Sequence, residues 1–328
     1  MSTGIQWTDE TWNPIRARRT WPDGESLRGW HCERVSPGCE NCYAETLNEK
    51  RFGTGLGYTR PSRDMVSIYL DERTLSQPLH WRKPRRVFVC SMTDLFGEWV
   101  TDEMLDRVFA VMALTPHITY QVLTKRPEQA LAYLTQPDVV GDVEGEADAL
   151  AGAFGWHHSG DWSWPLPNVW LGVSVEDQRR ADERIPVLMD TPAAVRFLSC
   201  EPLLGAVDLS HWVGCEICGK ALPCDCGFHE EPALDWVIVG GESGAGARPC
   251  DLAWVRSIVS QCQTAGTAVF VKQLGAKPCE AHERWSDDRG SMVTSYPDVQ
   301  WVKLRDRHGA NMSEWPEDLR EREFPRCP

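Results

Sequence analysis

Short apolar runs rich in β-branched residues recur along the chain, and nearly every run ends in polar residues. Such continuous apolar runs are typical of strands that are buried on both faces, which indicates a parallel sheet with helical crossovers. The runs that we expect to be strands are 66–70, 86–94, 119–127, 169–177, 195–203, 235–243 and 268–275, with a shorter candidate at 4–9.

Helical periodicity fills several of the intervals between these runs. Residues 101–115 carry apolar side chains at three- and four-residue steps, with Thr101 as the expected N-cap. Residues 251–266 repeat the pattern, and Gly266 stands where a C-cap glycine is expected. The alternation of strands and helices predicts an α/β protein.

The polar strand ends favour a TIM-type (β/α) barrel, complete or partial, over a doubly wound sheet. In a barrel the chemistry collects where parallel strands end, and we expect these side chains to meet there. Some of them are expected to be only capping or turn residues. The polar residues at strand ends are Thr93, Asp94, Thr124, Lys125, Arg126, Ser174, Glu176, Ser199, Glu201, Glu242, Ser243, Lys272 and Gln273.

The barrel is expected to span residues 1–276, with two insertions. Residues 136–166 are acidic and rich in glycine, and residues 205–233 are rich in cysteine. The polar, weakly periodic segment 277–328 is expected to pack on the barrel as a C-terminal extension.

Charge and hydropathy exclude some classes of protein. The net charge of −14 argues against a protein that coats nucleic acid. Two local exceptions are the basic stretches 16–19 and 81–86, each either a solvated face or a groove for a phosphate backbone. The chain contains no apolar run of the length that a membrane span needs, and its first residues do not resemble a signal peptide. We therefore expect a cytoplasmic protein.

Three of the 13 cysteines lie close together at Cys32, Cys39 and Cys42. Clustered cysteines with C-x-x-C spacing in a reducing compartment indicate metal ligation. A closed zinc site needs four ligands, for which His31 is a candidate fourth. Three thiolates that leave one position open are instead what a [4Fe–4S] cluster needs if one iron binds a substrate.

A second cysteine group lies in the insertion 205–233, with His211 and His229 on either side. Four thiolates in a segment too short for its own core suggest a structural Zn²⁺ site, and an auxiliary iron–sulfur cluster or unliganded thiols are the alternatives. The four residues are Cys215, Cys218, Cys224 and Cys226.

The motifs "HCERVSPGCENCYAE", "KPRRVFVCSMTDLF", "LTKRP", "WLGVSVEDQ", "FLSCEPLLG" and "DWVIVGGESGAGARP" occur in this order along the chain. Over residues 4–276 the chain resembles a phage and prophage family of three-cysteine-motif proteins catalogued under a domain of unknown function. That family is itself similar to radical S-adenosylmethionine (SAM) enzymes. The spacing here is C-x6-C-x2-C, whereas C-x3-C-x2-C is usual in radical SAM enzymes, and the "GGE" motif follows a late strand.

The resemblance implies that the three clustered cysteines bind a [4Fe–4S] cluster whose open iron holds SAM. An electron donor would then drive reductive cleavage of SAM, which starts radical chemistry on a bound substrate. The residues that it places near the cofactors are Tyr43, Ser91, Gly240, Gly241, Glu242 and Ser243. The candidate catalytic residues are Lys125, Glu176, Glu201 and Lys272.

The phage context of that family favours a nucleotide, a nucleobase or a nucleic acid as substrate. Two other functions stay open: a non-catalytic zinc-binding barrel, and a metal-dependent nuclease or repair enzyme that holds a hard cation with Asp94, Glu176, Glu201 and Glu242. Glu242 also has a structural alternative, because it could cap the following turn or pair with Arg248.

Overall fold

Seven strands of the computed structural model belong to one sheet, in the order β1-β5-β6-β7-β8-β9-β11. Neighbours in this sheet follow one another in chain order, which is the connectivity of a β/α barrel rather than of a doubly wound sheet. The strands are β1 (Glu10–Trp12), β5 (Arg85–Val89), β6 (Ile118–Thr124), β7 (Val169–Ser174), β8 (Val195–Cys200), β9 (Trp236–Gly240) and β11 (Ala268–Gln273). The mixed α/β architecture is consistent with the partial form of the predicted barrel.

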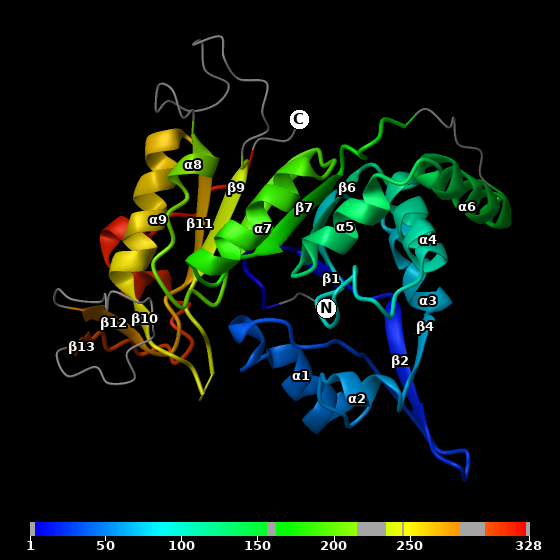
Figure 1. The fold of residues 1–328 in the computed structure, drawn as a ribbon, viewed down its shortest axis with the longest axis horizontal. Coiled ribbons are helices and arrows are strands. Elements are labelled where there is room, and N and C mark those ends of the chain that lie inside the picture. Colours follow the sequence, from blue (N-terminus) through cyan, green and yellow to red (C-terminus); the bar gives the residue numbers. More distant parts are fainter. Residues whose placement is uncertain (1–3, 156–161, 215–233, 245, 282–298, 326–328) are drawn as a thin grey trace. The chain divides into compact units, whose positions relative to one another are not determined.

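The chain divides into two compact units, which Figure 1 shows with the element labels used below. Unit 1 comprises residues 1–174 and 183–197, and unit 2 comprises residues 175–182 and 198–326. The structure describes residues 4–155, 162–214, 234–244, 246–281 and 299–325. The pairs β1–β5, β5–β6 and β6–β7 of unit 1 and the pair β9–β11 of unit 2 are parallel.

The predicted N-cap of one helix and the predicted C-cap of another are confirmed. In α4, the side chain of Thr101 accepts a hydrogen bond from the backbone N–H of Met104. In α9, Asp251 caps the first turn and Gly266 ends the helix with φ of 73°. The α-helices are α1 (Tyr43–Leu47), α2 (Arg60–Arg63), α3 (Glu72–Leu75), α4 (Asp102–Ala113), α5 (Pro127–Leu134), α6 (Val139–Phe154), α7 (Gln178–Asp190), α8 (Ser210–Val213) and α9 (Leu252–Ala265).

Two strand predictions are wrong. The first strand of the sheet is β1, at residues 10–12 rather than 4–9. The run 66–70 forms β4 (Ser67–Leu70), but β4 belongs to a separate antiparallel sheet of order β3-β2-β4, with β2 (Ile15–Thr20) and β3 (Ser26–Gly29). Because β4 pairs with β2 of the hairpin and with no strand of the seven-stranded sheet, the run does not belong to the barrel.

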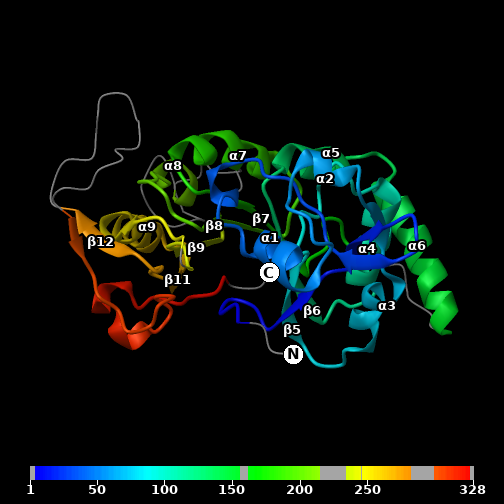
Figure 2. The same cartoon turned by 90° about the horizontal axis from the view of Figure 1, so that it is seen from below.

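The acidic segment 136–166 contains a helix, α6. Figure 2 shows α6 beside α4, and the two helices pack against each other within unit 1. The second cysteine group lies outside the described residues, so the predicted cysteine-rich insertion and its metal stay predictions. None of the described helices is long and apolar enough to span a bilayer.

Residues 277–325 contribute to unit 2. β12 (Pro278–Ala281) and β13 (Val299–Trp301) form a sheet with β10 (Cys250–Asp251). The backbone further along pairs with β11, since the N–H of Glu323 donates to the carbonyl of Val269 at 2.9 Å. This pairing covers the last strand of the sheet order, whose backbone groups would otherwise lack partners.

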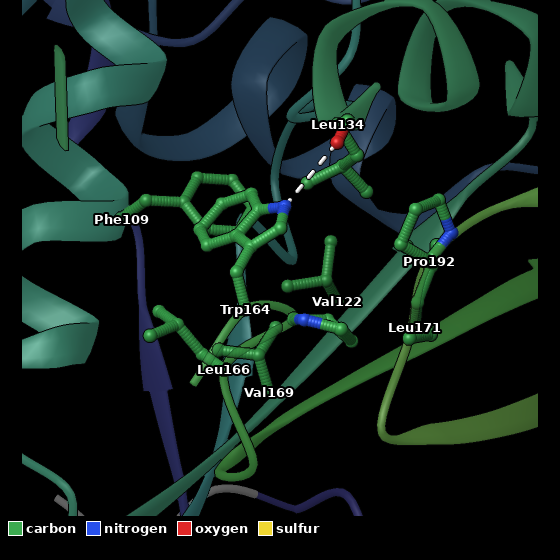
Figure 3. A pocket seen from close by; sticks show the side chains of 10 residues that line it. Phe109, Val122, Leu134, Trp164, Leu166, Val169, Leu171 and Pro192 are labelled. Carbon is green, nitrogen blue, oxygen red and sulfur yellow. Dashed lines mark hydrogen bonds between the residues drawn. The ribbon is translucent and has the colours of Figure 1, made fainter. Parts of the chain in front are cut away.

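A small apolar cavity lies in unit 1 (Figure 3). Its lining includes Phe109 of α4, Leu134 of α5 and Val122 of β6. Trp164 borders it and donates from its indole N–H to the carbonyl of Leu134 at 3.3 Å. The lining carries no carboxylate, imidazole or thiol, so this cavity offers no group for chemistry.

Candidate functional site

The three-cysteine loop connects the β2–β3 hairpin to helix α1. Cys39 ends the short 3₁₀ helix η1 (Pro37–Cys39), and Cys42 is the N-cap residue of α1. Cys32 and Cys42 both pack against one group of buried side chains, here called the Trp30 cluster: Trp30, Ala44, Tyr58 and Met92. Two of the three thiols therefore share one hydrophobic wall.

The electrostatic environment of the thiols is mixed. Burial, together with the charges of Asp94, Cys42 and Cys39, raises the pKa of Cys32 to about 12, and Arg126 opposes this shift. Burial also raises the pKa of Cys42, while backbone N–H groups at the start of α1 and the ammonium of Lys125 act to lower it. The three thiols thus lie within electrostatic reach of one another, and each of two cations acts on one of them.

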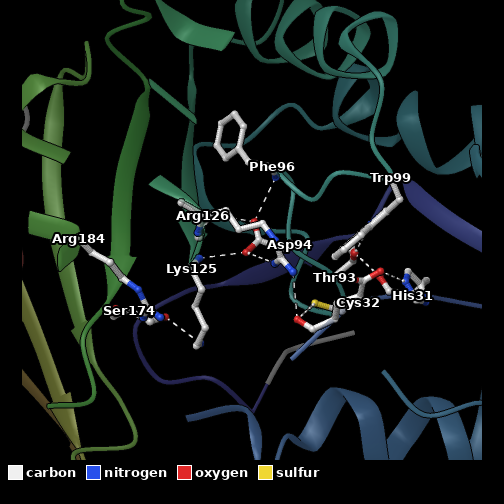
Figure 4. A network of polar contacts seen from close by, with 12 residues as sticks. His31, Cys32, Thr93, Asp94, Phe96, Trp99, Lys125, Arg126, Ser174 and Arg184 are labelled. Atoms are coloured by element: carbon white, nitrogen blue, oxygen red, sulfur yellow. Dashed lines mark hydrogen bonds and ion pairs between the residues drawn. The ribbon is translucent and has the colours of Figure 1, made fainter. Parts of the chain in front are cut away.

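Asp94 follows β5 and occupies the centre of the polar network in Figure 4. Its Oδ1 accepts from the hydroxyl of Thr124 at 2.6 Å and from the N–H of Phe96 at 3.1 Å. Its Oδ2 accepts from the N–H of Lys125 at 3.0 Å and from the guanidinium of Arg126 at 3.1 Å. Both carboxylate oxygens of Asp94 therefore accept hydrogen bonds from residues at the end of β6, and Oδ1 also accepts one from the turn that follows β5.

Arg126 links the strand ends to the three-cysteine loop. Besides its ion pair with Asp94, it donates to the carbonyl of Glu33 at 3.1 Å, and it stacks 4.8 Å from the ring centroid of Trp99. Burial acts to lower the pKa of Arg126, but the charges of Asp94 and Cys32 outweigh it and raise that pKa. The arginine is thus held as a cation beside Cys32.

Three further hydrogen bonds tie the loop to the segment that follows β5. The hydroxyl of Thr93 donates to the carbonyl of His31. The hydroxyl of Tyr43 donates to the carbonyl of Ser91 at 2.7 Å, and that of Tyr58 donates to the carbonyl of Met92 at 2.6 Å. The loop is therefore anchored at the carboxyl end of a parallel strand, where β/α barrels place their chemistry.

Lys125 lies at the end of β6 and donates from Nζ to the hydroxyl of Ser174, at the end of β7, at 3.0 Å. The guanidinium of Arg184 in turn donates to the carbonyl of Ser174 at 2.7 Å. The structure thus brings together, in unit 1, the predicted residues Cys32, Cys39, Cys42, Tyr43, Ser91, Asp94, Lys125 and Ser174.

The predicted residues from Glu176 to Gln273 that the structure describes lie in unit 2. Nζ of Lys272 lies 3.2 Å from Oε2 of Glu201. A Cβ added at Gly240 would lie 2.7 Å from Oε1 of Glu201, and one at Gly241 would lie 2.4 Å from the carbonyl of Leu274. The two glycines therefore serve close packing inside unit 2. Glu176 is fully buried in this unit.

Glu242 is bonded to Arg248, as the structural alternative proposed. Its Oε2 accepts from the backbone N–H and from Nε of Arg248, both at 2.9 Å, and its Oε1 accepts from Nη2 at 2.7 Å. A role of Glu242 and Ser243 in SAM binding stays a prediction.

Sequence reasoning missed several residues that shape the site. Trp99 stacks on Arg126, and Glu45 accepts from Arg34 and from the N–H of Tyr58. These residues lie in helices and turns without a strand-end signal. The sequence shows that one is an aromatic residue and the other an acid, but it does not show which residues they contact.

The donor set distinguishes between kinds of metal group. Across the described parts of the chain, no three His, Cys, Asp or Glu side chains converge as a single metal ion requires. Nε2 of His31, the candidate fourth zinc ligand, lies 3.5 Å from Oε1 of Glu33. In a [4Fe–4S] cluster each thiolate binds a different iron. The sulfur atoms of three cysteine ligands therefore lie further apart than they would around a single metal ion. Three neighbouring thiols with adjacent cations are compatible with the donor set of such a cluster.

Comparison with protein-family models gives one match, over residues 2–301, to the family described as "Protein of unknown function (DUF5131)". The chain belongs to this family. The predicted membership of a family catalogued under a domain of unknown function is thereby confirmed. No curated protein and no solved structure matches the chain significantly.

Proposed function

We propose that this protein is a radical SAM-like enzyme in which Cys32, Cys39 and Cys42 hold a [4Fe–4S] cluster. The observation that carries the proposal is a loop with three mutually interacting thiols, anchored at the carboxyl ends of β5 and β6. When bound, such a cluster supplies the electron that cleaves SAM reductively and starts radical chemistry on a substrate.

The residues of the chain have separate tasks in this proposal. Arg126 and Lys125 offset the negative charge of the thiolates, since they act on Cys32 and Cys42 respectively. The Trp30 cluster shields Cys32 and Cys42 from water on one side. Tyr43, which is 53% exposed and bonded to Ser91, presents its ring beside the last cysteine.

The substrate is proposed to be a nucleotide, a nucleobase or a nucleic acid, and a reducing partner must deliver the electron. The cysteines of the segment 215–226 are proposed to hold zinc or an auxiliary cluster. Glu201 and Lys272, which form an ion pair in unit 2, stay candidates for substrate chemistry, as does Glu176.

The proposal is tested by anaerobic reconstitution with iron and sulfide. The wild-type protein should bind about four irons at this loop, the content of the proposed cluster type. Replacing Cys32, Cys39 and Cys42 by Ala should remove those irons and their visible absorption. Replacing the buried Cys262 and Cys279 by Ala is the matched control and should leave both unchanged.

The SAM chemistry has its own readout. Reconstituted wild-type protein with a chemical reductant should release methionine and 5′-deoxyadenosine from SAM, and the triple-cysteine variant should not. Unchanged iron content in the triple variant would contradict the cluster, and zinc bound at this loop would favour the non-catalytic zinc-binding barrel.

A further inference from the structure

The register of the antiparallel sheet β3-β2-β4 places arginines on one face. Arg18 of β2 lies directly opposite Arg28 of β3. Arg16, two residues before Arg18 on β2, has Tyr69 of β4 as its partner. Residues two apart on a strand, and residues directly opposite on its neighbours, share a face. Like charges placed directly opposite each other are destabilising, so this face has a charge arrangement that an anion would stabilise.

Among the described residues, no carboxylate lies within ion-pair distance of Arg16, Arg18 or Arg28, although the negative charge of Asp71 acts on Arg16 and Arg28. The Nε atoms of Arg16 and Arg18 are shielded from solvent and have no hydrogen-bond partner in the part of the chain that the structure describes. The guanidinium groups stack on rings instead: Arg16 lies 4.1 Å from the centroid of Trp30, and Arg18 lies 5.0 Å from that of Tyr69. Stacking occupies the faces of these planar cations, and because Nε is shielded, the terminal Nη groups are the donors left for an acceptor such as phosphate.

The arginine face adjoins the three-cysteine loop. Trp30, on which Arg16 stacks, is the first member of the cluster that contacts Cys32 and Cys42. Phe52, at the end of the π-helical turn η2 (Asn48–Phe52), meets Trp30 edge-on with 6.3 Å between ring centroids. This phenylalanine is 57% exposed. A cationic row and an exposed ring therefore lie on either side of one tryptophan, beside the thiols.

We propose that this face binds the phosphodiester backbone of a single-stranded nucleic acid, whose unpaired bases stack on Phe52. Arginine rows that follow a backbone, combined with exposed rings, are the general means of gripping single strands. A duplex would leave Phe52 without a partner, because its bases are already stacked. The net charge of −14 disfavours binding over the remaining surface. The inference that the nucleic acid is the enzyme's substrate rests on the proposed function. The binding of the nucleic acid to this face does not require the iron–sulfur cluster.

The test is fluorescence anisotropy with labelled oligonucleotides and the full-length, reconstituted protein. Wild-type protein should bind single-stranded DNA or RNA more tightly than a duplex of equal length. For the double variant Arg18→Gln, Arg28→Gln, the slope of log affinity against log salt should become shallower by about 1.4, because each neutralised phosphate of a single strand contributes about 0.7. Phe52→Ala should weaken binding about 5- to 100-fold, the effect expected for loss of one stacked base.

Matched controls separate this face from charge in general. Lys303→Gln with Arg307→Gln removes the same charge at two exposed residues of unit 2 and should leave the salt slope unchanged. Phe52→Tyr keeps a stacking ring and should retain most of the affinity. Equal slopes for the two double variants, or equal affinity for single strand and duplex, would overturn the inference.

Iron content measured on the same samples keeps this inference distinct from the proposed function. The arginine variant should keep its iron while losing affinity for the oligonucleotide. The triple-cysteine variant should keep its affinity while losing iron. A wild-type protein that binds iron but no oligonucleotide would refute the nucleic-acid surface and leave the cluster in place.

Discussion

Replacing Asp94 by Asn removes one charge of the ion pair that links the strand ends to the three-cysteine loop. The pair is buried, since the side chains of Asp94 and Arg126 are 7% and 8% exposed, and its atoms lie 3.1 Å apart. Asparagine keeps one oxygen for Thr124 and Phe96, but its amide NH₂ then faces the donors of Lys125 and Arg126. Arg126 is left as a buried cation without its carboxylate.

Removing one partner of a buried ion pair costs about 3–5 kcal/mol, because the remaining charge stays desolvated. We expect Asp94→Asn to lower the free energy of unfolding of unit 1 by that amount. The loop should loosen as well, because Arg126 also donates to the carbonyl of Glu33. Urea-induced unfolding, followed by tryptophan fluorescence and fitted for the midpoint and slope, measures the change.

The chain offers a matched control in Asp9→Asn. Asp9 pairs with Arg86 at 3.1 Å, but these side chains are 47% and 31% exposed. The same substitution there should cost at most about 1 kcal/mol, since water screens the pair. Equal costs at Asp94 and Asp9 would refute the reasoning from burial.

A double variant tests the cause of the cost. Asp94→Leu combined with Arg126→Met removes both charges and should be less destabilising than Asp94→Asn alone, because no unpaired charge remains buried. If the double variant is the less stable of the two, the cost arises from lost packing or hydrogen bonds and not from the orphaned arginine.

Two further predictions concern packing and pH. A Cβ at Gly172 of β7 would lie 2.5 Å from the ring of Phe197, so Gly172→Ala should cost about 1–3 kcal/mol in thermal unfolding, and Phe197→Leu in the same chain should restore part of it; an undiminished stability would contradict this. Burial acts to raise the pKa of Asp9, but its bonds to Arg86 outweigh burial and lower that pKa below 3.8. The Asp9–Arg86 pair therefore stabilises the fold at neutral pH, and its contribution is lost as the pH falls through the folded-state pKa. The difference in stability between wild type and Asp9→Asn should shrink as the pH is lowered below 3.8, and a constant difference would contradict the assignment.

Strands and helices were predicted correctly where the residues themselves carry the signal, either as capping residues or as a continuous apolar run. The caps at Thr101 and Gly266 could be predicted because each depends only on residues close in sequence. A hydroxyl accepts from the first turn of a helix, and a glycine adopts the positive φ that ends one. The runs at β5 to β9 and β11 are buried on both faces, so the apolar pattern was continuous. The three residues of β1 gave too short a pattern for its position to be predicted.

The antiparallel sheet was missed because its apolar face is small. In β2 the inward positions are Ile15 and Ala17, while the intervening positions are arginines, so the stretch resembled a charged surface. One signal was available: the "WPDG" sequence between β2 and β3 is a turn sequence, and Gly24 adopts φ of 90° there. A turn with strands on both sides would have predicted the hairpin.

Part of the candidate site could be predicted from the sequence, and part of it could not. Polar residues at the ends of neighbouring parallel strands must lie near one another, and Asp94 with the end of β6 confirms this. The anchoring of the three-cysteine loop could not be predicted, because it depends on Tyr43 and Tyr58, whose partners are backbone carbonyls of a distant segment. Backbone carbonyls carry no sequence signal.

The adjacent residues Lys125 and Arg126 show most directly what the fold adds. In sequence they are two cations after a strand, and either could be a solvated charge. In the folded chain Arg126 opposes the rise in the pKa of Cys32, and Lys125 opposes that of Cys42. Both residues lie in the short connection between β6 and α5, and each of them acts on a different thiol. Burial alone would keep the thiols of Cys32 and Cys42 protonated. Arg126 and Lys125 favour the thiolate forms instead. A metal group that binds thiolates is therefore stabilised by both cations.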